Sequence, residues 1–196
     1  PVFPASEEEL YERLGLAWIP PELREDAGEV EAAAAGRLPS LVTEADIRGD
    51  LHLHTTWSDG IDTLREMALA ARARGYEYIA VSDHTPSLAV ARGLTPERLR
   101  QQAEEIAALN RELAPFRILR SAEVDILRDG RLDLPDEVLA ELDIVTASVH
   151  SAFHLGREEM TARLLAAIRH PRVHIIGHLT GRLLGRRPAY EVDLDA

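Results

Sequence analysis

The chain has 196 residues, a length that suits one domain with a short appendage. It contains no cysteine, which excludes disulfide scaffolds and thiol nucleophiles, and no lysine, which excludes Schiff-base chemistry and a Walker A loop. Its 22 arginines are outnumbered by 34 acidic residues, so a net charge of −12 gives the bare protein no general attraction for nucleic acid. Without an apolar run of roughly 18 residues or a signal peptide, we predict a cytoplasmic protein with no membrane partner.

Residues 1–47 differ in composition from the rest of the chain. Ser6 before three glutamates is typical of an N-cap and predicts a short helix over 7–14. The prolines at 20–21 require extended backbone, and a second helix is predicted over 29–35, ending at Gly36. This helical arm is either a linker from an upstream domain or an ordinary arm that packs on its own domain.

From Ile47 onward, predicted strands and helices alternate. The strands are expected at 47–55, 78–82, 117–124, 144–148 and 173–176, and the helices at 63–74, 95–113, 135–141 and 158–169. Such alternation predicts βα units and an α/β fold built on a parallel sheet or barrel. Five units are too few to close a (β/α) barrel.

Two histidines lie on the first of these strands. Alternate residues of a strand share a face, so His52 and His54 project to one side while Leu51 and Leu53 project to the other. Their Cα atoms are about 6.6 Å apart, which allows both imidazoles to reach one metal ion. This pair alone is weak evidence for a metal site.

Further metal-competent side chains follow the other strands. The carboxyl ends of parallel strands meet at one edge, where such folds bind ligands. Seven donors exceed the needs of one tetrahedral ion, so we predict two to three divalent ions, with Zn, Mn or Fe suited to mixed imidazole and carboxylate ligands. The predicted ligands are His52, His54, Asp59, His84, Glu123, His150 and His178.

Other polar residues near this edge receive different interpretations. Asp83 is expected to orient a ligand rather than to bind metal. Arg182 and Arg186, in a cluster with Arg187, are candidate phosphate-binding residues, although a solvated charged loop would look the same. The remaining histidines are expected to lie outside the ligand set: His154, His170 and His174.

Five short motifs resemble, in order and spacing, the PHP (polymerase and histidinol phosphatase) domain: residues 50–60, 82–85, 122–125, 148–151 and 177–178. Within that family the sequence is most similar to the C-terminal PHP domain of bacterial X-family DNA polymerases, because residues 14–24 look like the junction with the polymerase domain. The resemblance implies a distorted seven-stranded (β/α) barrel, here 48–196 and incomplete at its C-terminus, preceded by the tail of an upstream polymerase at 1–47.

The resemblance also implies a ligand set and an activity. One ion would be held by His52, His54 and Glu123, a second by Asp59 and His84, and a third by Glu123, His150 and His178, with Glu123 bridging. A downstream Asp-x-His motif of the family does not occur in this sequence, so the first two sites are each expected to lack one ligand. The implied activity is manganese-dependent 3′–5′ exonuclease and repair-type hydrolysis of DNA ends. The alternatives are a histidinol-phosphatase-like small-molecule phosphatase and a non-catalytic structural module.

Overall fold

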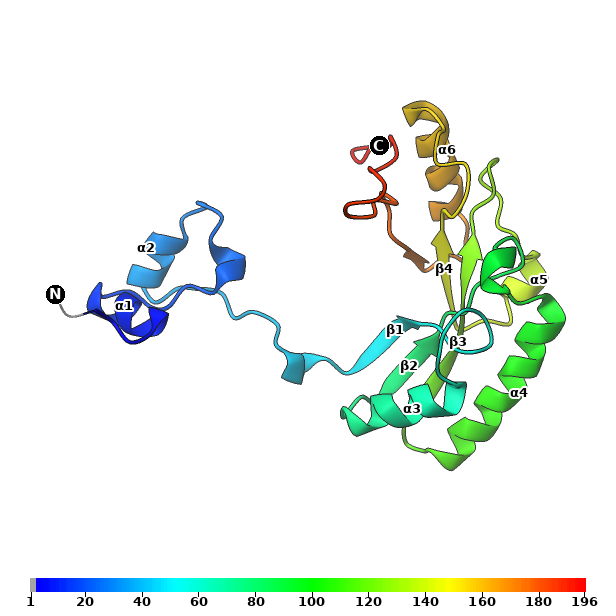
Figure 1. The fold of residues 1–196 in the computed structure, drawn as a ribbon, viewed down its shortest axis with the longest axis horizontal. Helices are drawn as coiled ribbons and strands as arrows, with labels where there is room; N and C mark the ends of the chain where they lie inside the picture. The colour runs from blue at the N-terminus through cyan, green and yellow to red at the C-terminus, as the bar shows by residue number, and fades with distance from the viewer. Residues whose placement is uncertain (1–2) are drawn as a thin grey trace. The chain divides into compact units, whose positions relative to one another are not determined.

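A computed structural model describes residues 3–196 and divides the chain into two compact units, one ending at Asp46 and one spanning Ile47–Ala196 (Figure 1). The first unit contains helices α1 (Glu7–Arg13) and α2 (Glu29–Ala34) and the 3-10 turns η1 (Pro21–Leu23) and η2 (Glu44–Asp46). Both helices were predicted from the sequence. Ser6 caps α1 as expected, because its side chain accepts a hydrogen bond from the Glu9 backbone N–H.

An ion pair ties the first unit together. Nη1 and Nη2 of Arg24 each donate to the Glu7 carboxylate at 2.8 Å, and Trp18 Nε1 donates to the same carboxylate at 3.0 Å. Arg24 also donates to the Ile19 carbonyl. The extended segment between α1 and α2 is thereby anchored to the start of α1.

The second unit is a five-stranded parallel sheet whose strands lie in sequence order. The strands are β1 (Gly49–Leu53), β2 (Tyr78–Val81), β3 (Arg117–Asp125), β4 (Ile144–Ser148) and β5 (Ile175–Ile176). The connecting helices are α3 (Leu64–Ala73), α4 (Pro96–Glu112), α5 (Asp136–Leu139) and α6 (Arg157–Ile168), with a 3-10 turn η3 (Ala89–Ala91) before α4. This arrangement is a half-barrel and confirms the α/β prediction.

Local capping chemistry sets the ends of α3 and α4. Thr63 and Glu66 form a capping box at the start of α3, and Thr95 caps α4 with Pro96 in its first turn. Gly75 follows α3 in a left-handed conformation. These signals explain why the predicted and observed helix bounds agree within about one residue.

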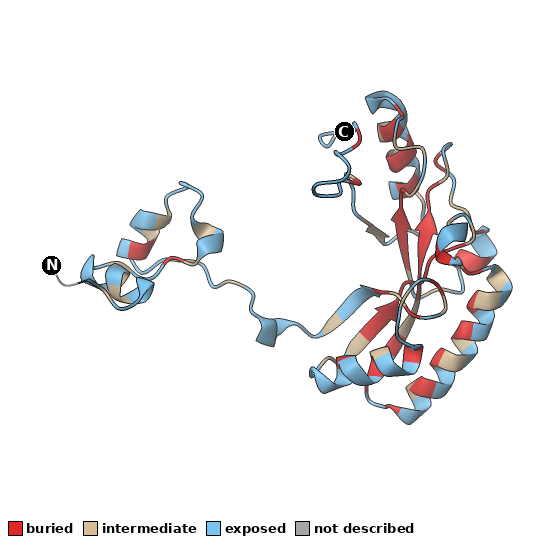
Figure 2. Ribbon diagram, in the orientation of Figure 1, coloured by how far each residue is buried: buried red, intermediate tan, exposed pale blue. Residues whose placement is uncertain are grey.

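The two faces of the sheet have different chemistry. Ile79, Val81 and Ile118 are buried with apolar residues of α3 and α4, and Figure 2 shows burial concentrated in the strands and on one side of these helices. On the other face, polar residues lie toward the carboxyl edge: Ser82, directly after β2, and Ser121 on β3 lie 3.0 Å apart through their Oγ atoms. This polar face carries the candidate site.

The outermost strands depart from the sequence prediction. β5 is limited to Ile175–Ile176, because Nδ1 of His174 accepts a hydrogen bond from the Val145 backbone N–H at 3.1 Å in place of a ladder carbonyl. On β1, Leu53 is buried but Leu51 is 40 % exposed. Within residues 3–196, no helix combines the length and the apolar character needed to cross a bilayer.

Candidate metal centre

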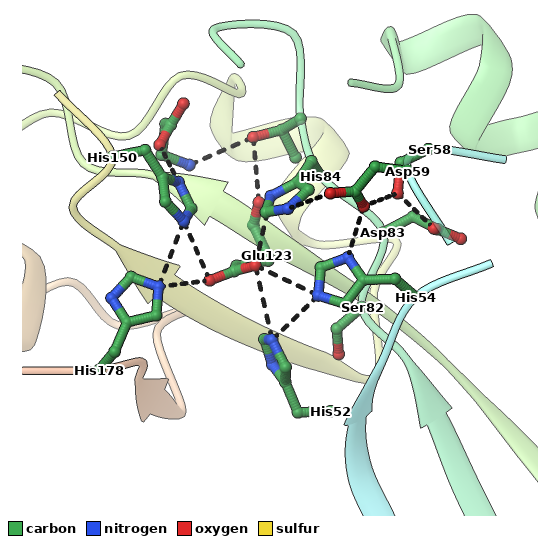
Figure 3. Close-up of polar contacts among 12 residues, drawn as sticks. His52, His54, Ser58, Asp59, Ser82, Asp83, His84, Glu123, His150 and His178 are labelled. Carbon is green, nitrogen blue, oxygen red and sulfur yellow. Dashed lines mark hydrogen bonds and ion pairs between the residues drawn. The ribbon is translucent and has the colours of Figure 1, made fainter. Parts of the chain in front are cut away.

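One buried carboxylate lies at the centre of five imidazoles. Glu123, near the end of β3, is only 2 % exposed, and its two oxygens face different groups of histidines (Figure 3). Oε1 lies 3.0 Å from His178 Nε2 and 3.2 Å from His150 Nε2. Oε2 lies 3.2 Å from His84 Nδ1, 3.4 Å from His54 Nε2 and 3.5 Å from His52 Nε2.

Each histidine comes from a different position at the carboxyl edge of the sheet. His52 lies within β1 and His54 directly after it, and His84 follows β2 and forms a parallel backbone bridge with Glu123. His150 follows β4, and His178 follows β5. The parallel topology therefore brings together side chains that are up to 126 positions apart in the sequence.

Gly177 allows the end of β5 to approach this centre. A Cβ atom at position 177 would lie 2.3 Å from Ser148 Oγ and 3.6 Å from Glu123 Oε1. A side chain at this position therefore requires Ser148 Oγ to turn or the end of β5 to move, together with the adjacent His178.

The nitrogens of neighbouring imidazoles also face one another. His52 and His54 approach through their Nε2 atoms at 3.2 Å, and His150 and His178 do the same at 3.2 Å. Two ligands bound about 2.1 Å from one ion are about 3.0–3.4 Å apart, so these separations suit shared coordination. The HxH prediction that two imidazoles converge is consistent with this geometry.

Two buried nitrogens test whether the residues fit a metal. His54 Nδ1 and His84 Nδ1 are buried and have no hydrogen-bond partner. Leaving such groups unpaired is costly, whereas neutral imidazole nitrogens are good ligands for divalent ions. Three groups have ligand atoms within 4.8 Å of one another and could hold a metal ion: His52, His54 and Glu123; His54, Asp59 and His84; and His84, Glu123 and His150.

Asp59 completes the second of these groups from a loop after β1. Its carboxylate lies 3.4 Å from His54 Nδ1 and 3.6 Å from His84 Nε2. The loop is held by arginines from the η3–α4 region: Arg92 donates to the Ser58 carbonyl and Arg98 to the Trp57 carbonyl.

Asp83 supports the same loop and does not join the imidazole cluster. Its buried carboxylate accepts hydrogen bonds from Thr55 N at 2.8 Å, Thr55 Oγ1 at 2.7 Å, Ser58 Oγ at 2.5 Å and Gln102 Nε2 at 2.6 Å. These four donors occupy the carboxylate, and none of them belongs to a predicted metal ligand, so Asp83 holds the loop that carries Asp59.

Asp125 was assigned no role from the sequence, and its carboxylate contacts the cluster through His150. Asp125 Oδ1 lies 2.5 Å from His150 Nδ1, on the opposite side of the ring from Glu123. The available signal was the strand period, because Asp125 is two residues after Glu123 and shares its face of β3.

The cluster sets the protonation of its members. Burial raises the pKa of Glu123, but hydrogen bonds with His150, His178 and His52 outweigh it and hold that pKa well below its usual range. Burial lowers the pKa of His84 despite the nearby carboxylates. Burial also opposes the charged form of His150, but Asp125 and Glu123 together raise its pKa to about 9.

The remaining sequence candidates lie outside the contacts of the cluster. Arg182 and Arg186 are exposed on the turn that is closed by the Leu183–Arg187 bridge, and no hydrogen bond or ion pair joins either side chain to the cluster. Arg187 instead covers the Phe153 ring at 3.9 Å. His154 is exposed, and His170 pairs with Asp136 at 3.2 Å.

The fold and the cluster define an α/β half-barrel whose strand ends carry side chains that could hold metal ions. Residues 50–190 match the PHP domain, and the chain belongs to this family.

Three relatives indicate the chemistry of the family. The chain is 52 % identical over 190 residues to the DNA polymerase/3'-5' exonuclease PolX of Bacillus subtilis, an alignment that covers 97 % of this chain and 33 % of that protein. It is 31 % identical over 151 residues to a probable phosphatase of Syntrophotalea carbinolica, covering 75 % of this chain and 58 % of the phosphatase. A probable phosphatase of Clostridium acetobutylicum is 32 % identical over 151 residues, with 75 % and 57 % covered.

The chain thus spans about a third of the length of PolX and less than three fifths of these phosphatases. Similarity to both kinds of protein supports a phosphoesterase-type module.

Proposed function

We propose that this chain is the phosphoesterase module of an X-family DNA polymerase and removes nucleotides from DNA 3′ ends during repair synthesis. The observation that carries the proposal is the contact of one buried carboxylate, Glu123, with five imidazoles. The 52 % identity to PolX supports DNA as the substrate.

The metal ligands follow from the contacts. His52, His54 and Glu123 would hold one ion, and Asp59 and His84 would hold a second. His150 and His178 would hold a third together with Glu123, which would then be shared between ions. Zn, Mn and Fe suit this donor set, and such ions activate water and stabilise the oxygen that leaves phosphorus.

The protein's own groups prepare the site for a phosphodiester. Glu123 stays ionised because surrounding imidazoles lower its pKa, and its negative charge favours cations at the centre. In the reaction, a water oxygen bonds to phosphorus and the bond from phosphorus to the 3′ oxygen breaks. The leaving oxygen takes a proton, which gives a shortened strand and a free nucleotide.

Substrate binding must overcome the acidic character of the chain. Because the chain has a net charge of −12, its overall electrostatic field does not attract DNA. The bound ions and local arginines would therefore hold the DNA backbone. Arg182 and Arg186 are exposed and can bind phosphate oxygens through two donors each. The upstream unit would connect this module to polymerase domains of the same protein, since PolX is three times as long as the matched region.

A small-molecule phosphatase of the histidinol phosphate type is the competing function. The similarity to probable phosphatases favours it, although those identities are near 31 %. A non-catalytic structural role is a third possibility, which predicts a centre that binds no metal.

The test compares substrates and variants in the 196-residue chain. With Mn²⁺ added, we expect shortening of a DNA strand labelled at its 5′ end and little release of phosphate from histidinol phosphate. Glu123→Gln should lose this activity, whereas His154→Gln, which alters an exposed histidine outside the cluster, should retain it. Faster hydrolysis of histidinol phosphate, or equal loss in both variants, would overturn the proposal.

A further inference from the structure

The two ring nitrogens of His150 face different partners. Nε2 lies 3.2 Å from Glu123 Oε1 and 3.2 Å from His178 Nε2, toward the metal centre. Nδ1 lies 2.5 Å from Asp125 Oδ1, away from it. Each ring nitrogen faces a carboxylate oxygen, which only accepts hydrogen bonds, and the contact with Asp125 is the shorter of the two. The single proton of the neutral ring therefore belongs on Nδ1 and the lone pair on Nε2.

Asp125 is held rigidly behind His150. It is 5 % exposed, and its backbone N–H donates to Thr85 Oγ1 and to Asp133 Oδ1, each at 3.2 Å. Its backbone position on β3 is paired with Ser148 on β4, two residues before His150. These contacts fix the backbone from which the Asp125 carboxylate reaches His150.

A buried arginine joins the two segments from the α6 side. Arg163 is 2 % exposed and donates to the carbonyls of Ile126 and Ser151. These residues directly follow Asp125 and His150, so one guanidinium fixes the spacing of the two strand ends. An arginine suits this role because its donors are spread in a planar fork.

The other four imidazoles of the cluster lack this arrangement within residues 3–196. The only other carboxylate near their second nitrogens is Asp59, at 3.4 Å from His54 and 3.6 Å from His84, without a hydrogen bond. His150 is therefore the member whose tautomer is set by a dedicated buried acid.

We propose that Asp125 is a positioning residue that holds His150 with its proton on Nδ1 and its Nε2 lone pair directed at the Glu123–His178 side of the centre. Its relevance to metal binding rests on the proposed function. Hydrogen bonds of this kind orient metal-binding histidines and increase their basicity, and their loss typically lowers metal affinity by about 10–100-fold.

Two measurements on the full 196-residue chain test this inference. Long-range ¹H–¹⁵N correlation spectra of the metal-free protein, at a pH where the ring is neutral, reveal which nitrogen of His150 carries the proton. The His150 signals are assigned by their loss in His150→Gln. We expect the proton on Nδ1 in the wild type and, in Asp125→Asn, a population with the proton on Nε2, because the amide can donate to Nδ1.

The second measurement is Zn²⁺ affinity by chelator competition. Asp125→Asn should weaken binding by about 10–100-fold. Asp136→Asn, which alters the exposed His170–Asp136 pair, is the matched control and should bind Zn²⁺ as the wild type does. A wild-type proton on Nε2, or unchanged affinity in a folded Asp125→Asn, would overturn the inference. A wild type that binds no Zn²⁺ but keeps the proton on Nδ1 would overturn the proposed function and leave the orienting role of Asp125 supported.

Discussion

His84 and Glu123 are joined twice, through a parallel bridge between their backbones and through a 3.2 Å contact between Nδ1 and Oε2. The bridge extends the pairing of β2 with β3 beyond the end of β2, so it sets the height of both side chains above the sheet. Glu123 thereby reaches histidines on both sides of β3. The contact of Glu123 with the histidines is consequently a product of strand register.

The four donors around Asp83 make this residue a support for the loop that carries Asp59. Asp83→Asn would place an amide N–H against groups that themselves donate, from Thr55, Ser58 and Gln102. We expect a loss of about 2–3 kcal/mol in the free energy of unfolding, measured by urea denaturation. Asp129→Asn, at an exposed pair with Arg131, should change it by less than about 0.5 kcal/mol. Equal stability of the two variants would contradict the role assigned to Asp83.

Gly177 is predicted to be necessary for the position of His178. Because a Cβ atom there would lie 2.3 Å from Ser148 Oγ, Gly177→Ala should displace β5 and weaken Mn²⁺ binding. We expect at least a tenfold loss of affinity by isothermal titration, of the size seen when ligand orientation is lost. Gly156→Ala is the control, since nothing lies within 4 Å of its added Cβ. Wild-type affinity in Gly177→Ala would show that the close approach does not position His178.

Metal affinity should depend on pH through the histidines. Imidazoles must be neutral to bind a metal, and protons compete as the pH falls toward and below about 6. Because the pKa of His150 is raised to about 9, the Zn²⁺ dissociation constant should begin to rise below that pH and should rise more steeply between about pH 7 and pH 5, with release of protons on binding. A constant affinity over this range would contradict histidine coordination.

The first unit should respond to acid through Glu7. Hydrogen bonds from Arg24 and Trp18 lower the pKa of Glu7 to about 2 in the folded state. A carboxyl group whose pKa is lowered by folding stabilises the folded state at pH values above its unfolded pKa of about 4.5. That stabilisation is lost as the pH falls from about 4.5 toward 2. The Trp18 indole N–H resonance should shift over this range. Glu7→Gln should abolish the shift and Glu12→Gln should preserve it; a shift that persists in Glu7→Gln would refute the assignment.

The sequence was sufficient to predict the helices whose first residues carry capping signals. Thr63 and Thr95 with Pro96 predicted helix starts to within a residue, and the strand period placed His52 and His54 on one face. The extent of β5 could not be predicted, because it depends on a side chain of His174 taking the place of a ladder carbonyl.

The site was partly predictable from the alternation of strands and helices. Parallel topology places the residues after each strand at one edge, which is enough to bring His84, His150 and His178 near Glu123. The roles of Asp125 and Arg163 depend on side-chain contacts across two strands and a helix, and no local sequence pattern predicts such contacts.

We propose that Glu123 is shared between metal ions held by the five surrounding histidines. Anomalous X-ray scattering from crystals of the chain grown with Mn²⁺ or Zn²⁺ tests this proposal, because the signal locates the ions. We expect at least two peaks, on the two oxygen sides of Glu123, and their loss in Glu123→Gln but not in His154→Gln. Peaks elsewhere on the chain, or none at the carboxylate of Glu123, would contradict it.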